Sequence, residues 1–86
     1  MSFIGRIVVS EAGRDKGEYL AVIGECENYF LLANGRKHPL EKPKRKKIKH
    51  VEVLERRLSE GFTELVRNGE ATNKGLFREI KENIFD

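Results

Sequence analysis

The stretch "FIGRIVVSEAGRDKGEYLAVIGE", residues 3–25, decides the fold of this chain. Two segments within it, residues 6–10 and 19–24, are rich in β-branched and aromatic residues and have the lengths of strands. Between them lies "GRDKG", residues 13–17, with two glycines, two cations and one acid. The glycines indicate a sharply bent backbone, and the cations indicate a negatively charged partner outside the loop.

The residues that follow supply further strands. Residues 29–35, "YFLLANG", read as a third strand that ends in Asn34-Gly35, the strongest short hairpin signal. Residues 36–43 contain two prolines, so a fourth strand there must be short or on an edge. Residues 47–54, "KIKHVEVL", supply a fifth, and its break in alternation at His50-Val51 allows a bulge or a change of face. Five short strands with no helix between them predict a small antiparallel barrel.

The hydrophobic period becomes helical from Leu54 onward. Apolar residues at helical spacing predict a helix over residues 54–68, in which Gly61 is a candidate break. Asn68-Gly69 is a plausible stop, and Thr72 or Asn73 could cap a second short helix. That helix has one apolar stripe, made of Leu76, Phe77, Ile80 and Ile84. The expected fold is mostly β with C-terminal α: a barrel over residues 1–54 and a helical extension over 55–86 that packs on it.

Charge is distributed unevenly along the 86 residues. The formal net charge is +3 and the mean hydropathy is -0.57. Residues 1–50 carry 11 Lys or Arg against 6 Asp or Glu, whereas residues 51–86 carry 6 against 8. The first part is therefore basic (+5) and the second slightly acidic (-2). Such an asymmetry favours an anionic partner for the first part.

The sequence gives little support to catalysis or metal binding. Cys26 is the only cysteine, so an intramolecular disulfide and a cysteine metal cage are excluded. The two histidines, His38 and His50, are twelve positions apart and have no ligand-like spacing. The sequence shows no h-region of a signal peptide and no apolar run of membrane-spanning length. We expect a cytoplasmic protein without cofactor, metal, membrane association or small-molecule substrate, and not an enzyme.

A run of cations is the strongest candidate site. Residues 42–49, "KPKRKKIK", hold six cations and no acid, and lead directly into an apolar strand. Cations anchored beside a barrel neutralise phosphates at a lower ordering cost than cations in a free tail. Tyr19, Tyr29 and Phe30 lie in predicted strands, where packing in the core is common. Recognition of RNA backbone and shape therefore fits better than readout of single-stranded sequence.

The first half resembles the KOW motif of large-subunit ribosomal proteins and of transcription elongation factors of the NusG class. The matching stretch is "IGRIVVSEAGRDKGEYLAVIGECENYFLLANG", residues 4–35. Gly17 falls where the motif keeps its glycine. Four further positions match, namely Gly5, Val8, Gly13 and Lys16. The run "HPLEKPKRKKIKHV", residues 38–51, is similar to that of archaeal and eukaryotic large-subunit proteins with a KOW barrel. Short bacterial relatives of those proteins are similar over the whole chain.

This resemblance implies a small SH3-like barrel that binds structured RNA, especially ribosomal RNA. It implies that Gly13 and Gly17 shape the loop and that Arg14 and Lys16 face RNA. The expected RNA-binding set is completed by the eight cations of residues 36–49: Arg36, Lys37, Lys42, Lys44, Arg45, Lys46, Lys47 and Lys49. Two alternatives stay open. One is a barrel that docks a protein of the translation or transcription machinery, such as a ribosomal protein, and the other is a small architectural protein that binds DNA.

Overall fold

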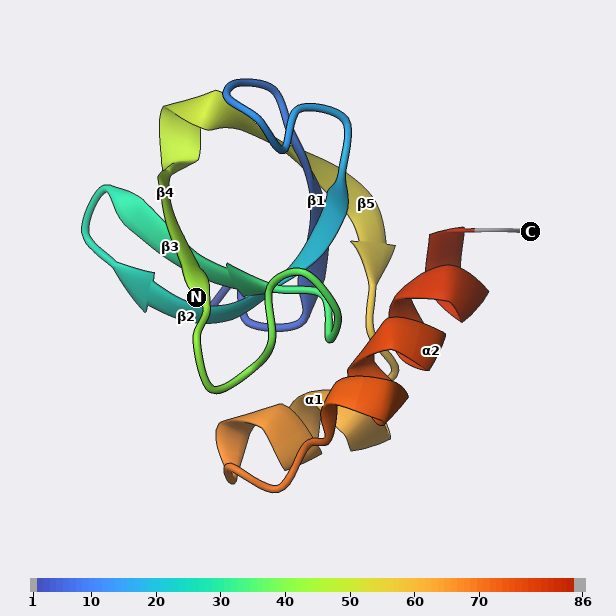
Figure 1. The fold of residues 1–86 in the computed structure, drawn as a ribbon. Coiled ribbons are helices and arrows are strands. Elements are labelled where there is room, and N and C mark those ends of the chain that lie inside the picture. The colour runs from blue at the N-terminus through green and yellow to red at the C-terminus, as the bar shows by residue number, and fades with distance from the viewer. Residues whose placement is uncertain (1, 85–86) are drawn as a thin grey trace.

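The computed structural model describes residues 2–84 as a five-stranded antiparallel sheet followed by two helices (Figure 1). This confirms the predicted fold class. The strands are β1 (Arg6–Ser10), β2 (Tyr19–Cys26), β3 (Tyr29–Ala33), β4 (Lys44–Lys47) and β5 (Val51–Arg57). A 3-10 turn, η1 (Ile48–His50), joins β4 to β5, and the helices are α1 (Glu60–Arg67) and α2 (Asn73–Ile84).

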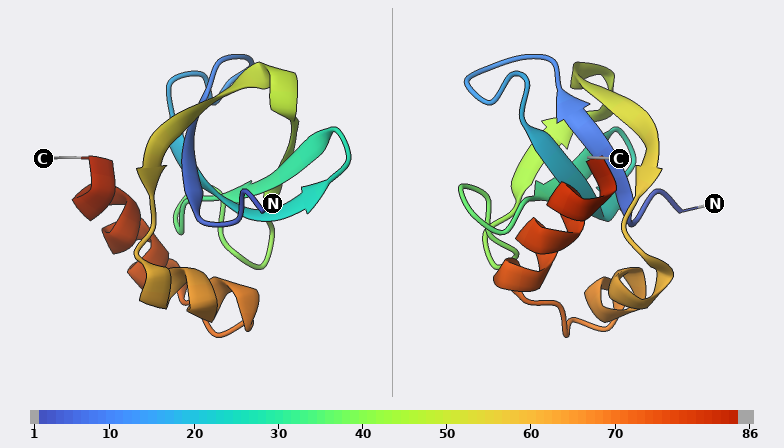
Figure 2. Two further views of the ribbon diagram at one scale, coloured as in Figure 1. Left: turned by 180° about the vertical axis from the view of Figure 1, so that it is seen from behind. Right: turned by 90° about the vertical axis from the view of Figure 1, so that its right-hand side faces the viewer.

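The sheet curls into a partly open barrel. Its strand order is β4-β3-β2-β1-β5, so β4 and β5 form the two edges. Every neighbouring pair is antiparallel, and the ladders shift register between Val22 and Gly24 and between Arg6 and Val8. Figure 2 shows the strands wrapping around the interior while both helices stay on one side. Among the described residues no backbone ladder joins β4 to β5, and the two edges are connected through η1.

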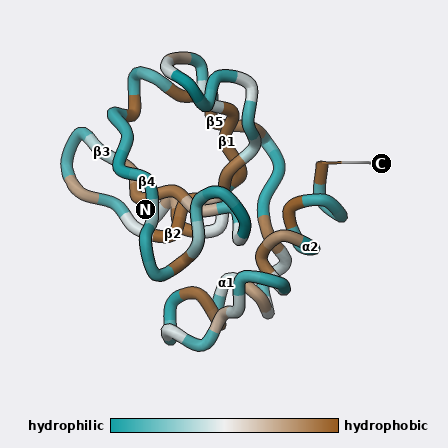
Figure 3. The backbone as a smooth tube through the Cα atoms, in the orientation of Figure 1, coloured by the Kyte–Doolittle hydropathy of each residue, from teal (hydrophilic) through white to brown (hydrophobic). Residues whose placement is uncertain are grey.

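Hydrophobic residues gather along the central strands (Figure 3), and each face of the sheet contributes to a buried apolar cluster. One cluster fills the barrel interior and consists of Val8, Leu20, Val22, Phe30, Leu32 and Val51. The other lies between the sheet and the helices and consists of Ile7, Ala21, Ala33, Leu58, Leu76 and Ile80. Neighbouring residues such as Ile7 and Val8 thus serve opposite clusters, because successive strand residues point to opposite faces.

The stop of α1 and the start of α2 follow signals expected from the sequence, whereas the start of α1 does not. Ser59 caps α1, because its Oγ accepts from the backbone N–H of Phe62. The predicted stop at Asn68-Gly69 is confirmed, since Gly69 has a φ of +73°. Thr72 is the residue that caps α2, because its Oγ1 accepts from the backbone N–H of Gly75 at 3.1 Å.

Several sequence-based boundaries were wrong. The fifth strand begins at Val51 and not at residue 47, because the 3-10 turn η1 occupies Ile48–His50. The fourth strand is short and on an edge as expected, but it occupies Lys44–Lys47 and not residues 36–43. Asn34-Gly35 does not form a tight hairpin, because it opens a longer connection, residues 34–43, here called the β3–β4 loop. The helical spacing that begins at Leu54 is misleading, since β5 continues to Arg57 and α1 begins only at Glu60. Gly61 therefore lies in the first turn of α1 and does not break it.

Candidate nucleic-acid interface

The β1–β2 loop, which joins those strands, turns its acid inward and its cations outward. Asp15 is only 5% exposed, whereas Arg14 and Lys16 on either side of it are exposed. The positive φ expected at Gly17 is present (+90°), and Gly13 has a φ of +85°. Glycine adopts this conformation readily because it lacks a Cβ. The two glycines thus let the backbone fold around a buried carboxylate and present two cations to solvent.

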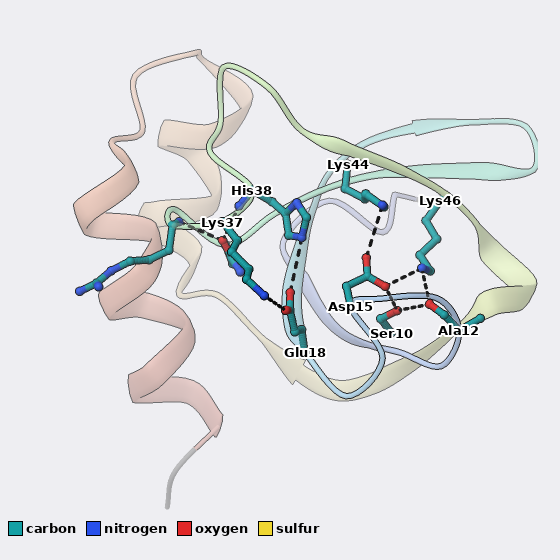
Figure 4. A network of polar contacts seen from close by, with 10 residues as sticks. Ser10, Ala12, Asp15, Glu18, Lys37, His38, Lys44 and Lys46 are labelled. Atoms are coloured by element: carbon teal, nitrogen blue, oxygen red, sulfur yellow. Dashed lines mark hydrogen bonds and ion pairs between the residues drawn. The ribbon is translucent and has the colours of Figure 1, made fainter.

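Asp15 is the centre of a buried polar network (Figure 4). Its Oδ1 accepts hydrogen bonds from the Nζ of Lys46 and from the Oγ of Ser10, both at 2.7 Å. The Nζ of Lys46 also donates to the carbonyl of Ala12 at 2.6 Å. The Nζ of Lys44 lies 3.8 Å from the Oδ2 of Asp15. This network ties the β1–β2 loop to the edge strand β4, across a region that has no backbone ladder.

Lys46 corrects the predicted RNA-binding set. Its side chain is 9% exposed, and its Cα is the ladder partner of Phe30, which faces the barrel interior. The burial pattern of β4 is exposed, exposed, buried, exposed from Lys44 onward. Successive side chains of a strand point to opposite faces, so Lys46 points inward. Its ammonium is used within the fold, and Lys46 is therefore not part of the candidate surface.

The environment of Asp15 changes its pKa. Burial alone would raise it, because the charged form is costly away from water. The hydrogen bonds from Lys46 and Ser10, together with the positive charges of Lys46 and Lys44, outweigh burial and hold the pKa of Asp15 below its ordinary value. The carboxylate form is therefore the one that the fold stabilises.

The outward side of β4 and the turn after it gather cations beside an aromatic ring. The guanidinium carbon of Arg45 lies 4.4 Å from the centroid of the Tyr29 ring. Lys47 and Lys49 are exposed, and a hollow of about 530 Å³ is lined by both of them together with Asn28, Tyr29 and Ile48. We call Tyr29, Arg45, Lys47 and Lys49 the β4 surface. Within residues 2–84 none of its three cations takes part in an ion pair.

The β3–β4 loop is fastened to the start of α2. The side chain of Asn73 accepts from the backbone N–H of Leu40 at 2.7 Å and donates to the Oε1 of Glu41 at 2.8 Å. Gly35 has a φ of +81° and lies so close to α2 that a Cβ would overlap the carbonyl oxygen of Asn73. The loop is thus placed by the C-terminal helix, although its cations belong to the basic first half.

The predicted cations of this loop have different surroundings. The guanidinium carbon of Arg36 lies 4.1 Å from the centroid of the Phe77 ring of α2. The Nζ of Lys37 lies 3.1 Å from the Oε2 of Glu18, whose other oxygen is 3.4 Å from the Nε2 of His38. Lys42 is exposed. Lys37 therefore already has a carboxylate partner, whereas Arg36 is placed against a ring of another element.

Sequence reasoning missed the cations of α2. Lys74, Arg78 and Lys81 are exposed and line one depression together with Arg36, Phe77 and Glu82. Their spacing of four and three residues, which places them on one helical face, was visible in the sequence. Because residues 51–86 carry more acidic than basic residues, no anion-binding face was expected there.

The structure thus sorts the predicted residues into groups. Arg45, Lys47 and Lys49 share the β4 surface, while Arg14 and Lys16 extend from the β1–β2 loop. Arg36 belongs with α2, and Lys46 is internal. Among residues 2–84 no group of three or more His, Cys, Asp or Glu could hold a metal ion. No helix in the described part of the chain is long and apolar enough to cross a membrane.

No family model matches the chain, and no match is found among curated proteins.

Proposed function

We propose that this protein binds structured RNA through the β4 surface, as a non-enzymatic module. Phosphate contacts come from Lys47, Lys49 and the edge of the Arg45 guanidinium. Arg14 and Lys16, which the β1–β2 loop presents to solvent, add further contacts. Each phosphate that is neutralised releases counterions, which is the main source of affinity for such surfaces.

The stacking of Arg45 on Tyr29 is the observation that carries this proposal. The guanidinium carbon of Arg45 lies over the Tyr29 ring at 4.4 Å from its centroid, and this cation–π contact restricts the side chain before it binds. Arginine presents a rigid fork of donors that matches the two oxygens of a phosphate. The adjoining hollow, which is lined in part by polar Asn28 and apolar Ile48, leaves space next to the backbone of the bound RNA.

The resemblance of residues 4–35 to the KOW motif points the proposal toward ribosomal RNA. On that reading the protein acts in the cytoplasm in association with the ribosome and contacts large-subunit RNA, with ribosomal proteins as neighbours. The positive φ values of Gly13 and Gly17 support the alignment, since the loop needs glycine at both positions. The open sheet and its two helices support it only at the level of fold class.

Salt-dependent binding of a labelled RNA hairpin tests the proposal. The test variant is Arg45→Gln with Lys47→Gln, and the matched control is Arg57→Gln with Arg67→Gln, which removes two exposed cations elsewhere. If both test residues contact phosphates, the slope of log K against log salt should fall in magnitude by about 1.5 units. The control should leave the slope unchanged.

Two results would count against RNA binding at this surface. One is an equal change of the slope in the test variant and in the control. The β4 surface would then be exposed to solvent without binding RNA. The other is tighter binding of a DNA duplex of the same length than of the hairpin, which would favour the architectural DNA-binding alternative. Thermal melts of both variants establish that each remains folded.

An apolar groove keeps a protein-docking function as the second candidate. It has a volume of about 530 Å³ and is lined by Ile23, Leu40, Val66 and Ala71, among others. Leu65 of α1, which precedes Val66 in the sequence, is 39% exposed. Sedimentation of the protein in lysate discriminates the two candidates. Loss of co-sedimentation with large subunits after ribonuclease treatment supports RNA binding, and retention after that treatment supports docking on a protein.

A further inference from the structure

We infer that the exposed face of α2, together with Arg36, is a second RNA-binding surface that takes the phosphate backbone of another segment of the same RNA. This inference rests on the proposed function and extends it to the C-terminal half of the chain. The α2 surface is defined by Arg36, Lys74, Phe77, Arg78 and Lys81.

The α2 surface concentrates positive charge in a depression. A hollow of about 380 Å³ is lined by four cations and one carboxylate, that of Glu82. Within residues 2–84 none of the four cations takes part in an ion pair. Four like charges gathered around one hollow repel one another, so binding of an anion there relieves a cost that the free protein carries.

Phe77 orders two of these cations. Its ring lies 4.1 Å from the guanidinium carbon of Arg36 and 5.5 Å from the Nζ of Lys81. Cations over a ring face are held by its quadrupole. Arg36 is further fixed through its backbone N–H, which donates to the Oδ1 of Asn34 at 2.9 Å. The site is therefore assembled from two segments that are distant in the sequence, the β3–β4 loop and α2, and two of its four cations lie over one shared ring.

The α2 surface is separate from the β4 surface. β4 is one edge of the sheet, whereas α2 contacts β5, the other edge, and β2. Figure 1 shows α2 and β4 on opposite sides of the barrel, with the β3–β4 loop between them. A ligand that contacts both surfaces must supply two stretches of regularly spaced negative charge. A folded RNA backbone has this property, and an isolated phosphate does not.

The test is an NMR titration of the ¹⁵N-labelled full chain with the RNA hairpin. If both surfaces bind RNA, the amides of β4 and those of Arg36, Lys74 and Arg78 shift and reach saturation together. Shifts confined to β4 would overturn the α2 site and leave the proposed function standing. Shifts confined to α2 would overturn the proposed β4 site and, with it, the inference of a second surface, and no shift at either would overturn both.

A charge-matched set of variants tests the same inference by affinity. Lys74→Gln with Arg78→Gln should lower the slope of log K against log salt by about 1.5 units in magnitude. Lys74→Arg with Arg78→Lys keeps both charges and should leave the slope unchanged, as should the Arg57→Gln and Arg67→Gln control. Glutamine is a good helix former, so α2 should be retained. A slope equal to that of the control would overturn the α2 site.

Discussion

The ammonium of Lys46 lies 2.7 Å from the carboxylate of Asp15, and both side chains are almost fully buried. One partner comes from an edge strand and the other from the loop between β1 and β2. The acid in "GRDKG" therefore holds the loop against β4, while its neighbouring cations stay free to meet a partner.

Removal of Lys46 should destabilise the fold far more than removal of Lys44. Lys46→Ala leaves the carboxylate of Asp15 buried without its main partner, which should lower the free energy of unfolding by about 3 kcal/mol or more. Lys44 is 43% exposed and 3.8 Å from Asp15. Lys44→Ala should therefore cost less than about 1 kcal/mol. Urea unfolding compares the two, and equal losses would contradict the structural role of Lys46.

Acid should abolish the contribution of Asp15 to stability. Because the pKa of Asp15 is lower in the fold than in the unfolded chain, its contribution is complete above the unfolded value of about 3.9. It is lost as pH falls through the lower, folded value. The difference in unfolding free energy between the wild type and Asp15→Asn should be constant from neutral pH to about pH 5 and shrink below about pH 4. A difference that stays constant down to about pH 2 would contradict this.

The buried pair also marks a limit of sequence reasoning. The sequence of residues 42–49 shows a concentration of positive charge, but it does not show which cation points inward. That is decided by the phase of β4, which begins at Lys44 and not within residues 36–43, where the fourth strand was expected. Once Lys44–Lys47 is known to be a strand, alternation predicts that Lys44 and Lys46 share a face. Replacing all four residues together would therefore mix a surface effect with the loss of a buried ion pair.

The parts of the fold that could be predicted depend on local signals. The strand at 6–10, the stop at Asn68-Gly69 and the cap at Thr72 follow from backbone preferences of nearby residues. The α2 surface could not be predicted in this way, because Arg36 and Phe77 are 41 positions apart and meet only through the docking of the β3–β4 loop. Contacts of such separation depend on tertiary packing, which periodicity does not encode.

Gly35 should tolerate alanine much less well than Gly17, although both have positive φ. Nothing lies within 4 Å of a Cβ built on Gly17, so Gly17→Ala adds only backbone strain, about 1 kcal/mol. At Gly35 a Cβ would meet the backbone of Asn73, which cannot move without displacing α2. Gly35→Ala should cost at least about 1 kcal/mol more than Gly17→Ala. Thermal melts provide the comparison, and similar melting temperatures would show that the loop can leave α2 at little cost.

The stability losses caused by alanine at two leucines should show how strongly α2 packs on the sheet. Leu76 is fully buried in the cluster that also contains Ile7 and Ala21, whereas Leu65 of α1 is 39% exposed. Leu76→Ala removes buried apolar surface and leaves a cavity, so it should lower the free energy of unfolding by about 3 kcal/mol. Leu65→Ala should change it by about 0.5 kcal/mol or less.

Urea unfolding of both leucine variants measures these losses, and RNA binding by the folded fraction supplies a second readout. A small loss for Leu76→Ala would mean that the helices add little to the stability of the barrel. Their apolar face would then be available to a protein partner, which is what the docking alternative requires. If instead the loss is large, the apolar face of α2 is committed to the sheet. The helix then turns Lys74, Arg78 and Lys81 to solvent, as RNA binding at the α2 surface requires.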